Sequence, residues 1–174
     1  RANEIACYLQ GAGLSDGASV AIAAANGAAA SFAFLGAVVG GFRATPLNLV
    51  AGVKTLSFVL FHSKTELILC ADDCRTMVED ALATMPKGSH IKPQIISMDI
   101  DDGPRWIGSG ITPVKVADLR QPTTETTGLL MYTSGTTGVP KGVLLSHSNL
   151  IAAGSNVCVA HKLDGTDTGM CVLP

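Results

Sequence analysis

Residues 17–48, GASVAIAAANGAAASFAFLGAVVGGFRATPLN, decide the fold of this 174-residue chain. The apolar run 19–25 predicts a short buried strand. A helix is expected over about 28–39, and the glycine pair that follows it is typical of the residues that end helices. Segment 42–48 then predicts a second strand. A strand, a helix and a strand within about thirty residues form a βαβ unit.

The same alternation of apolar strands and helices continues along the chain. Helical segments are predicted at 3–10, 51–62, 74–85 and about 148–161, with Asp72 and Asp73 capping the third and Ser148 the fourth. Further strands are predicted at 66–71, 92–100, 127–134 and 142–147, and another begins in 169–174. Residues 101–127 are polar and are expected to form an irregular connection. The predicted fold class is therefore α/β, with βαβ units forming a largely parallel sheet that carries helices on both faces.

Composition narrows the class of protein. Hydrophobic residues make up 47% of the chain and charged residues 15%, which excludes disorder, and a net charge of -2 argues against nucleic acid as a partner. The uncharged run between Asp16 and Arg43 is long enough to span a bilayer, but its turn signal and its alanines and glycines predict no transmembrane segment. The five cysteines show no metal-ligand spacing and predict buried thiols in a reducing, cytoplasmic protein.

The chain starts at Arg1 rather than methionine and stops at Pro174 within an apolar run. We therefore expect residues 1–174 to be a single α/β fragment of a longer product.

Residues 132–143, YTSGTTGVPKGV, concentrate hydroxyl and glycine residues ahead of one lysine. Glycines let backbone N–H groups converge on an anion, and hydroxyls donate to phosphate oxygens. The stretch follows a predicted strand, at the edge where parallel sheets bind ligands. A Walker A loop is excluded because Gly142, not serine or threonine, follows Lys141. A dinucleotide fingerprint at Gly11, Gly13 and Gly17 is disfavoured, because these glycines follow a predicted helix and precede a predicted strand. The fingerprint requires the reverse order. Lys141 is expected to dominate the attraction for phosphate.

The longer stretch 129–150, LLMYTSGTTGVPKGVLLSHSNL, closely resembles the AMP-binding signature of adenylate-forming enzymes: acyl-CoA and acyl-carrier-protein synthetases, luciferases and nonribosomal peptide adenylation domains. Upstream, 17–48 is similar to the N-terminal βαβ unit of that family. The resemblance implies the N-terminal lobe of the adenylate-forming fold, part of a large AMP-binding domain. It implies that the β- and γ-phosphates of ATP are held by Thr133, Ser134, Gly135, Thr136, Thr137 and Lys141, with Gly138 giving the loop its turn and Pro140 stiffening the approach to Lys141.

The activity implied by this resemblance is an ATP-dependent acid–thiol ligase. A carboxylic acid would be activated as an acyl-adenylate and transferred to coenzyme A or to the phosphopantetheine of a carrier protein. Lys141 would assist catalysis through its charge on the phosphates. Mg²⁺ would be held largely by the remainder of the polypeptide, and no residue of this chain is assigned as a metal ligand. The adenine site, the ribose site, the acyl pocket and the C-terminal domain are missing, so the chain alone is expected to be inactive. Fatty, aryl, dicarboxylic and amino acids all remain open as substrates.

A second hypothesis is a non-catalytic module that retains the loop and acts by nucleotide binding or assembly. The other titratable residues are expected to have structural rather than catalytic roles. His147 is expected to serve local packing, and the histidines at helix ends or on the surface are His62, His90 and His161. Asp99, Asp101 and Asp102 lack the spacing of a calcium loop and are expected to be solvated.

Overall fold

A computed structural model describes residues 1–86, 92–99, 102–106, 109–133 and 140–168. The elements are, in chain order, α1 (Ala2–Gly11), β1 (Ser19–Ala23), α2 (Ala28–Val39), β2 (Arg43–Pro46), η1 (Leu49–Ala51), α3 (Val53–His62), β3 (Thr65–Ala71), η2 (Asp72–Cys74), α4 (Arg75–Ala83), β4 (Gln94–Asp99), β5 (Gly103–Pro104), η3 (Val116–Asp118), β6 (Thr127–Thr133), β7 (Lys141–Ser146) and α5 (His147–His161).

The strands form one mixed sheet in the order β5-β4-β3-β1-β2-β6-β7. The five strands from β4 to β6 run parallel to one another, whereas β5 is antiparallel to β4 and β7 is antiparallel to β6. Helical crossovers connect β1, β2, β3 and β4, as parallel strands require. The predicted α/β class, with βαβ units and a largely parallel sheet, is confirmed.

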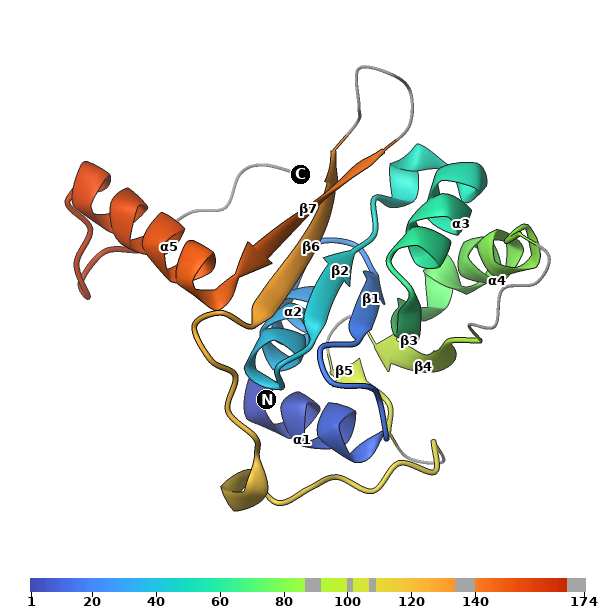
Figure 1. Ribbon diagram of the computed structural model, residues 1–174, viewed down its shortest axis with the longest axis horizontal. Helices are drawn as coiled ribbons and strands as arrows, with labels where there is room; N and C mark the ends of the chain where they lie inside the picture. Colours follow the sequence, from blue (N-terminus) through green and yellow to red (C-terminus); the bar gives the residue numbers. More distant parts are fainter. Residues whose placement is uncertain (87–91, 100–101, 107–108, 134–139, 169–174) are drawn as a thin grey trace.

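Helices cover both faces of the inner sheet, with α1 and α2 on one side and α3 and α4 on the other (Figure 1). Val20 and Ile22 of β1 belong to the apolar cluster that includes α1 and α2. Ala21 and Ala23 belong to the cluster with α3 and α4. Alternate residues of one strand therefore enter opposite cores, because successive side chains point to opposite faces. This double burial explains why the strands are apolar runs.

Close packing of α1 on α2 depends on a small residue at position 36. A Cβ built on Gly36 would lie 2.5 Å from Ile5 Cγ2, 2.6 Å from Ile5 Cβ and 3.1 Å from the carbonyl oxygen of Ala2. At its C-terminal end, α2 stops before Gly41, whose φ of 81° is in the left-handed region. The predicted bounds of this helix, 28–39, and its glycine stop are confirmed.

The helix caps differ from those predicted. The cap of α5 is Ser146 and not Ser148: the Ser146 hydroxyl accepts from the backbone N–H of Asn149, whose side chain accepts from the N–H of Ser146. The prediction that Asp72 and Asp73 cap α4 is also wrong. Both residues lie in η2, and the N-cap residue of α4 is Cys74, which makes no side-chain capping bond.

Two further boundaries differ from the prediction. The helix expected over 51–62 is divided at Gly52 into η1 and α3, because Gly52 has a φ of 80°. The connection 101–127 contains β5, which pairs Gly103 with Asp99. The strand expected to begin in 169–174 lies outside the described residues. No helix in the described ranges has the length and apolar character needed to cross a membrane.

Candidate functional site

The predicted phosphate loop belongs to a β-hairpin at the carboxyl edge of the sheet. β6 is parallel to β2, with Leu129 beside Ala44, so the C-terminal end of β6 lies at the edge where the parallel strands end. β6 and β7 are antiparallel, and Thr133 is the register partner of Lys141. The two residues at the ends of the predicted loop are therefore directly opposite each other, where Cα atoms are about 4.5–5.5 Å apart. Five predicted site residues lie outside the described part of the chain: Ser134, Gly135, Thr136, Thr137 and Gly138.

Thr133 and Lys141 are exposed, and as cross-strand partners they share one face of the hairpin. Within the described ranges, Lys141 forms no ion pair. Its ammonium group is therefore available to an anionic ligand. Pro140, directly before it, is half-buried.

An aromatic contact anchors the base of the hairpin to α3. Tyr132 Oη and His62 Nδ1 share a hydrogen bond of 2.8 Å, and the Phe58 ring stacks on His62 with centroids 5.3 Å apart. Tyr132 meets both rings edge-on. Burial raises the pKa of Tyr132, against the opposing effect of the Arg43 charge. The residue before the loop is thus held by α3, a contact that sequence reasoning missed because 70 positions separate Tyr132 from His62.

Behind this contact, buried hydroxyls link the inner strands. Ser19 and Thr45 share a hydrogen bond of 2.8 Å, and Ser63 and Thr65 share one of 2.7 Å. Arg43 Nη2 donates to the Ser63 carbonyl at 3.5 Å, while its buried Nε has no hydrogen-bond partner among the described atoms. This polar layer fixes the strands that carry the hairpin.

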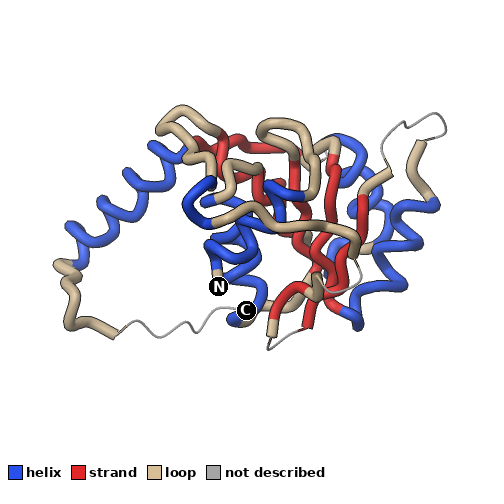
Figure 2. Tube along the Cα trace, turned by 90° about the horizontal axis from the view of Figure 1, so that it is seen from below, coloured by secondary structure: helices blue, strands red, loops and turns tan. Residues whose placement is uncertain are grey.

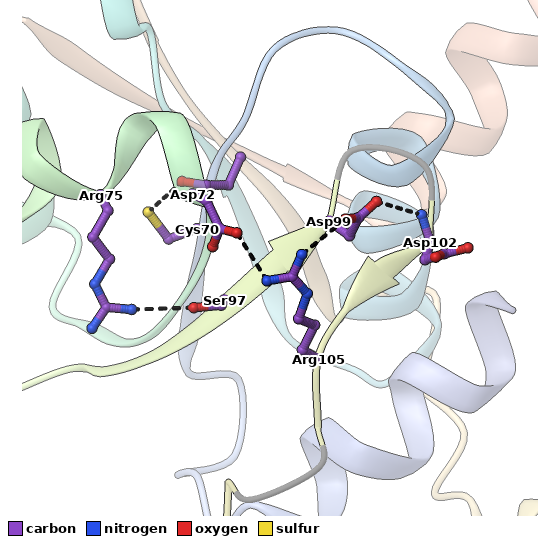
Figure 3. Close-up of polar contacts among 8 residues, drawn as sticks. Cys70, Asp72, Arg75, Ser97, Asp99, Asp102 and Arg105 are labelled. Carbon is purple, nitrogen blue, oxygen red and sulfur yellow. Dashed lines mark hydrogen bonds and ion pairs between the residues drawn. The ribbon is translucent and has the colours of Figure 1, made fainter.

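A second polar cluster lies at the carboxyl ends of β3 and β4 (Figure 3). Arg105 donates to Asp72 at 2.8 Å and to Asp99 at 2.9 Å, and Asp99 also accepts from the N–H of Asp102 at 3.1 Å. Arg105 and Asp72 are more than half exposed. Arg105 bridges the two carboxylates and so ties the end of β5 to η2 and to the end of β4. Asp101 lies outside the described residues.

The remaining histidines occupy simple positions. His147 is the first residue of α5 and lies against Gly128, where its Nε2 is buried without a hydrogen-bond partner among the described atoms. His62 and His161 end α3 and α5, as expected of helix-end residues. His90 lies outside the described ranges.

The cysteines do not behave uniformly. Cys7, Cys70 and Cys74 are buried, free thiols, whereas Cys158 is exposed on α5, so the prediction that all are buried is wrong. Burial raises the pKa of Cys70 to about 11 and that of Cys74 to about 12; the Asp73 carboxylate adds to the second shift. Cys171 lies outside the described residues.

Two cavities among the described residues lie away from the hairpin. One of about 270 Å³ is lined at the amino edge of the sheet by residues such as Gly17, Phe42 and Thr126, each of which directly or nearly precedes a strand. A cavity of about 180 Å³ lies beside α1 and β5. Both are smaller than the roughly 300–1,000 Å³ of typical ligand pockets. The hairpin is therefore the better candidate, as an open phosphate site rather than an enclosed pocket.

Open α/β sheets bind ligands at the carboxyl ends of their strands, and the β6–β7 hairpin lies at this edge. The sequence profile described as AMP-binding enzyme matches residues 1–174, and the chain belongs to that family. It is 34% identical over 163 residues to the sulfoacetate–CoA ligase of Cupriavidus necator, covering 94% of this chain and 31% of the relative.

Solved structures show the same fold. ATP-bound MatB from Rhodopseudomonas palustris superposes with a TM-score of 0.71 at 24% identity, and the fatty acyl CoA synthetase of Mycobacterium tuberculosis with 0.73 at 23%. Each alignment covers 91% of this chain and 30% of the other. The fold is that of the N-terminal region of adenylate-forming enzymes. The chain spans less than a third of the length of the curated relatives it matches.

Proposed function

We propose that the β6–β7 hairpin holds the β- and γ-phosphates of ATP, and that the chain is the N-terminal part of an acid–thiol ligase. The observation that carries the proposal is the pairing of Thr133 with Lys141 at the carboxyl edge of a parallel sheet, in a member of the AMP-binding enzyme family. In the proposed reaction, the carboxylate of an organic acid attacks the α-phosphorus of ATP and pyrophosphate leaves. A thiol, of coenzyme A or of phosphopantetheine, then attacks the acyl carbonyl and displaces AMP.

The chemistry of the hairpin suits the pyrophosphate end of the nucleotide. A charge pair at about 4 Å and an effective dielectric of 20 is worth roughly 4 kcal/mol before desolvation, whereas a neutral hydroxyl contributes about 1 kcal/mol. Lys141 would therefore supply most of the attraction. Thr133 and the hydroxyls of residues 134, 136 and 137 would set the orientation of the leaving group. Lys141 would stabilise the negative charge that develops on that group.

Magnesium would accompany the phosphates of the bound nucleotide. Among the described residues, no group of three or more histidine, cysteine, aspartate or glutamate side chains could hold a metal ion. Mg²⁺ usually binds through one or two carboxylates together with the phosphates of the substrate. Under the proposal, those carboxylates belong to a part of the polypeptide outside this chain. The relatives are named for acids as different as sulfoacetate and oxalate, so the proposal extends to acid–thiol ligases as a class.

The proposal is tested first by titrating the 174-residue chain with ATP, followed by NMR. We expect a dissociation constant of about 1 mM, equivalent to roughly 4 kcal/mol, because phosphate contacts alone are available. Lys141→Ala should weaken binding at least about tenfold. Lys92→Ala is the matched control, since Lys92 is exposed two residues before β4, at the opposite edge of the sheet. Equal effects of the two substitutions, or micromolar affinity for the chain, would contradict the proposal.

Catalysis is tested by ATP–pyrophosphate exchange. The longer polypeptide should exchange, its Lys141→Ala variant should not, and the 174-residue chain alone should show no exchange above background. Phosphate binding that depends on Lys141, without exchange in the longer polypeptide, would instead identify a non-catalytic nucleotide-binding module.

A further inference from the structure

The side chain of Tyr132 contacts both strands of the β6–β7 hairpin and α3. Tyr132 and Gly142 are opposite each other in the register of the two strands. A Cβ built on Gly142 would lie 3.5 Å from Cε1 and 3.6 Å from Cζ of Tyr132, so the ring extends over β7 at the residue that follows Lys141. At the far end of the ring, the phenol hydroxyl shares its hydrogen bond with His62 of α3. One side chain therefore joins both strands to the helix.

This ring lies behind the residues proposed to hold phosphate. Successive residues of a strand point to opposite faces of the sheet, so Tyr132 and Gly142 share one face. Thr133 and Lys141 share the other face. Helices cover both sides of the strands (Figure 2), and Tyr132 packs against the apolar cluster that includes α3. The ring therefore supports the proposed site from the opposite face and does not occupy it.

The partner of this ring is fixed to the rigid part of the molecule. His62 is the last residue of α3, and the Phe58 ring, one turn before it, stacks on the imidazole. Ser63, the next residue, is buried, and its hydroxyl shares a hydrogen bond of 2.7 Å with Thr65 at the start of β3. The phenol hydroxyl is therefore held by a helix end that is itself tied to an inner strand.

The contact lies where the hairpin leaves the parallel part of the sheet. β6 pairs with β2 at Leu129, and Tyr132 lies three residues further along the strand, towards the proposed phosphate loop. A two-stranded ribbon is only marginally stable by itself. The position of its end is therefore set by side-chain contacts with a larger body, and the contact of Tyr132 with α3 is of this kind.

We infer that Tyr132 is a positioning residue for the phosphate site, with His62 as the fixed partner that orients its ring. This inference rests on the proposed function, under which Lys141 attracts the phosphates of ATP. Contact between the ring and Gly142 limits the positions that the adjacent Lys141 can adopt before the ligand arrives. A lysine that had to be ordered during binding would reduce the affinity, because immobilising a flexible side chain costs free energy.

The inference is tested by titrating the 174-residue chain with inorganic tripolyphosphate, followed by NMR. Tyr132→Phe keeps the ring over Gly142 and removes the hydroxyl, whereas His62→Ala removes the partner on α3. Each should weaken tripolyphosphate binding about fivefold, which corresponds to the loss of one hydrogen bond. The double variant should weaken binding no further than either single variant, because both changes remove the same bond. His62→Asn, whose amide group reaches the position of Nδ1, should restore most of the affinity.

Gly36→Ala is the control that separates positioning from general stability. A Cβ at Gly36 would lie 2.5 Å from Ile5 Cγ2, so this variant disturbs the packing of α1 on α2, across the sheet from α3. It should destabilise the chain at least as much as Tyr132→Phe and leave tripolyphosphate binding unchanged. Equal weakening of binding by Gly36→Ala and Tyr132→Phe would overturn the inference.

Lys141→Ala distinguishes failure of the inference from failure of the proposed function. If Lys141→Ala weakens tripolyphosphate binding while Tyr132→Phe and His62→Ala do not, the inference is overturned and the proposed function stands. If Lys141→Ala binds as tightly as the parent, the proposed function fails and the inference fails with it. Weakening by all three variants, with binding unchanged in Gly36→Ala, supports both.

Discussion

Replacing Gly36 by alanine tests the packing that closes the core between α1 and α2. The new Cβ would lie 2.5 Å from Ile5 Cγ2 and 2.6 Å from Ile5 Cβ, well inside the roughly 3.5–4.0 Å at which carbon atoms pack best. Ile5 is buried, and its branched Cβ restricts rotation within a helix. The carbonyl oxygen of Ala2, at 3.1 Å, lies on the same helix. α1 must therefore move as a unit, by about 1 Å, to accept one methyl group.

Two opposing effects determine how much Gly36→Ala changes the free energy of unfolding. Alanine is favoured over glycine inside a helix by about 0.8–1.0 kcal/mol. Overpacking of a filled core costs about 1–3 kcal/mol. The cost at Gly36 should be near the upper end of this range, because the new Cβ meets the Cβ of Ile5 and the backbone of Ala2, which cannot rotate away. We expect a net loss of roughly 1–2 kcal/mol. Gly154→Ala in α5 is the matched control, because a Cβ there meets nothing within 4 Å. It should raise the helix content slightly and cost no stability.

Urea unfolding of the 174-residue chain, followed by circular dichroism, measures the effect. With a slope of about 2 kcal/mol per molar urea, Gly36→Ala should lower the midpoint by roughly 0.5–1 M without changing the slope. In an Ile5→Ala background the same substitution should cost less, since Cγ2 has been removed. A Gly36→Ala midpoint equal to or above that of the parent would refute the packing described for α1 and α2.

Two further predictions concern titratable side chains. Tyr132→Phe removes the hydrogen bond to His62 and should lower the free energy of unfolding in urea by about 1 kcal/mol. In a Tyr8→Phe background, phenolate absorbance should show Tyr132 ionising above pH 10, so that its contribution to stability is lost as the pH rises beyond 10. Ionisation in the ordinary range would contradict the burial of Tyr132. In a Cys171→Ser background at pH 8, Cys158 should react rapidly with a thiol reagent, whereas Cys70 and Cys74 should react only after unfolding. Because the folded pKa values are about 11 for Cys70 and about 12 for Cys74, stability should fall as the pH rises above 9. Rapid labelling of more than one thiol would refute this arrangement.

Sequence patterns predicted the inner sheet well because local and global signals agree there. The bounds 28–39 of α2 follow from an apolar run ended by glycines, and the observed helix has the same bounds. The hairpin around Lys141 was likewise expected as two strands joined by a loop, and the register of β6 and β7 agrees. The roles of Thr133 and Lys141 in phosphate binding remain predictions.

The errors arose where a residue's partner lies far along the chain or where two candidates adjoin. Asp72 was expected to cap a helix, but its carboxylate forms an ion pair with Arg105, 33 positions away. Ser146 and Ser148 are both chemically suited to cap α5, and the cap is set by which serine ends β7 and faces Asn149. The strand β5 has two residues, too few to create an alternating pattern. No local signal reports such contacts.

The two halves of the sheet have different physical tasks. From β4 to β2, helices on both faces bury the strands, and this closed half supplies the rigid body of the molecule. β6 and β7 lie beyond it, and the side chains of Met131 and Val143 remain exposed on one face of that pair. The lysine proposed to hold phosphate therefore lies on the less protected half, joined to the rigid half through β2 and through the contact of Tyr132 with His62. A binding site needs its charged group held in place before the ligand arrives. Those contacts fix the Thr133 side of the hairpin directly, and the Lys141 side through the Tyr132 ring, which lies against Gly142.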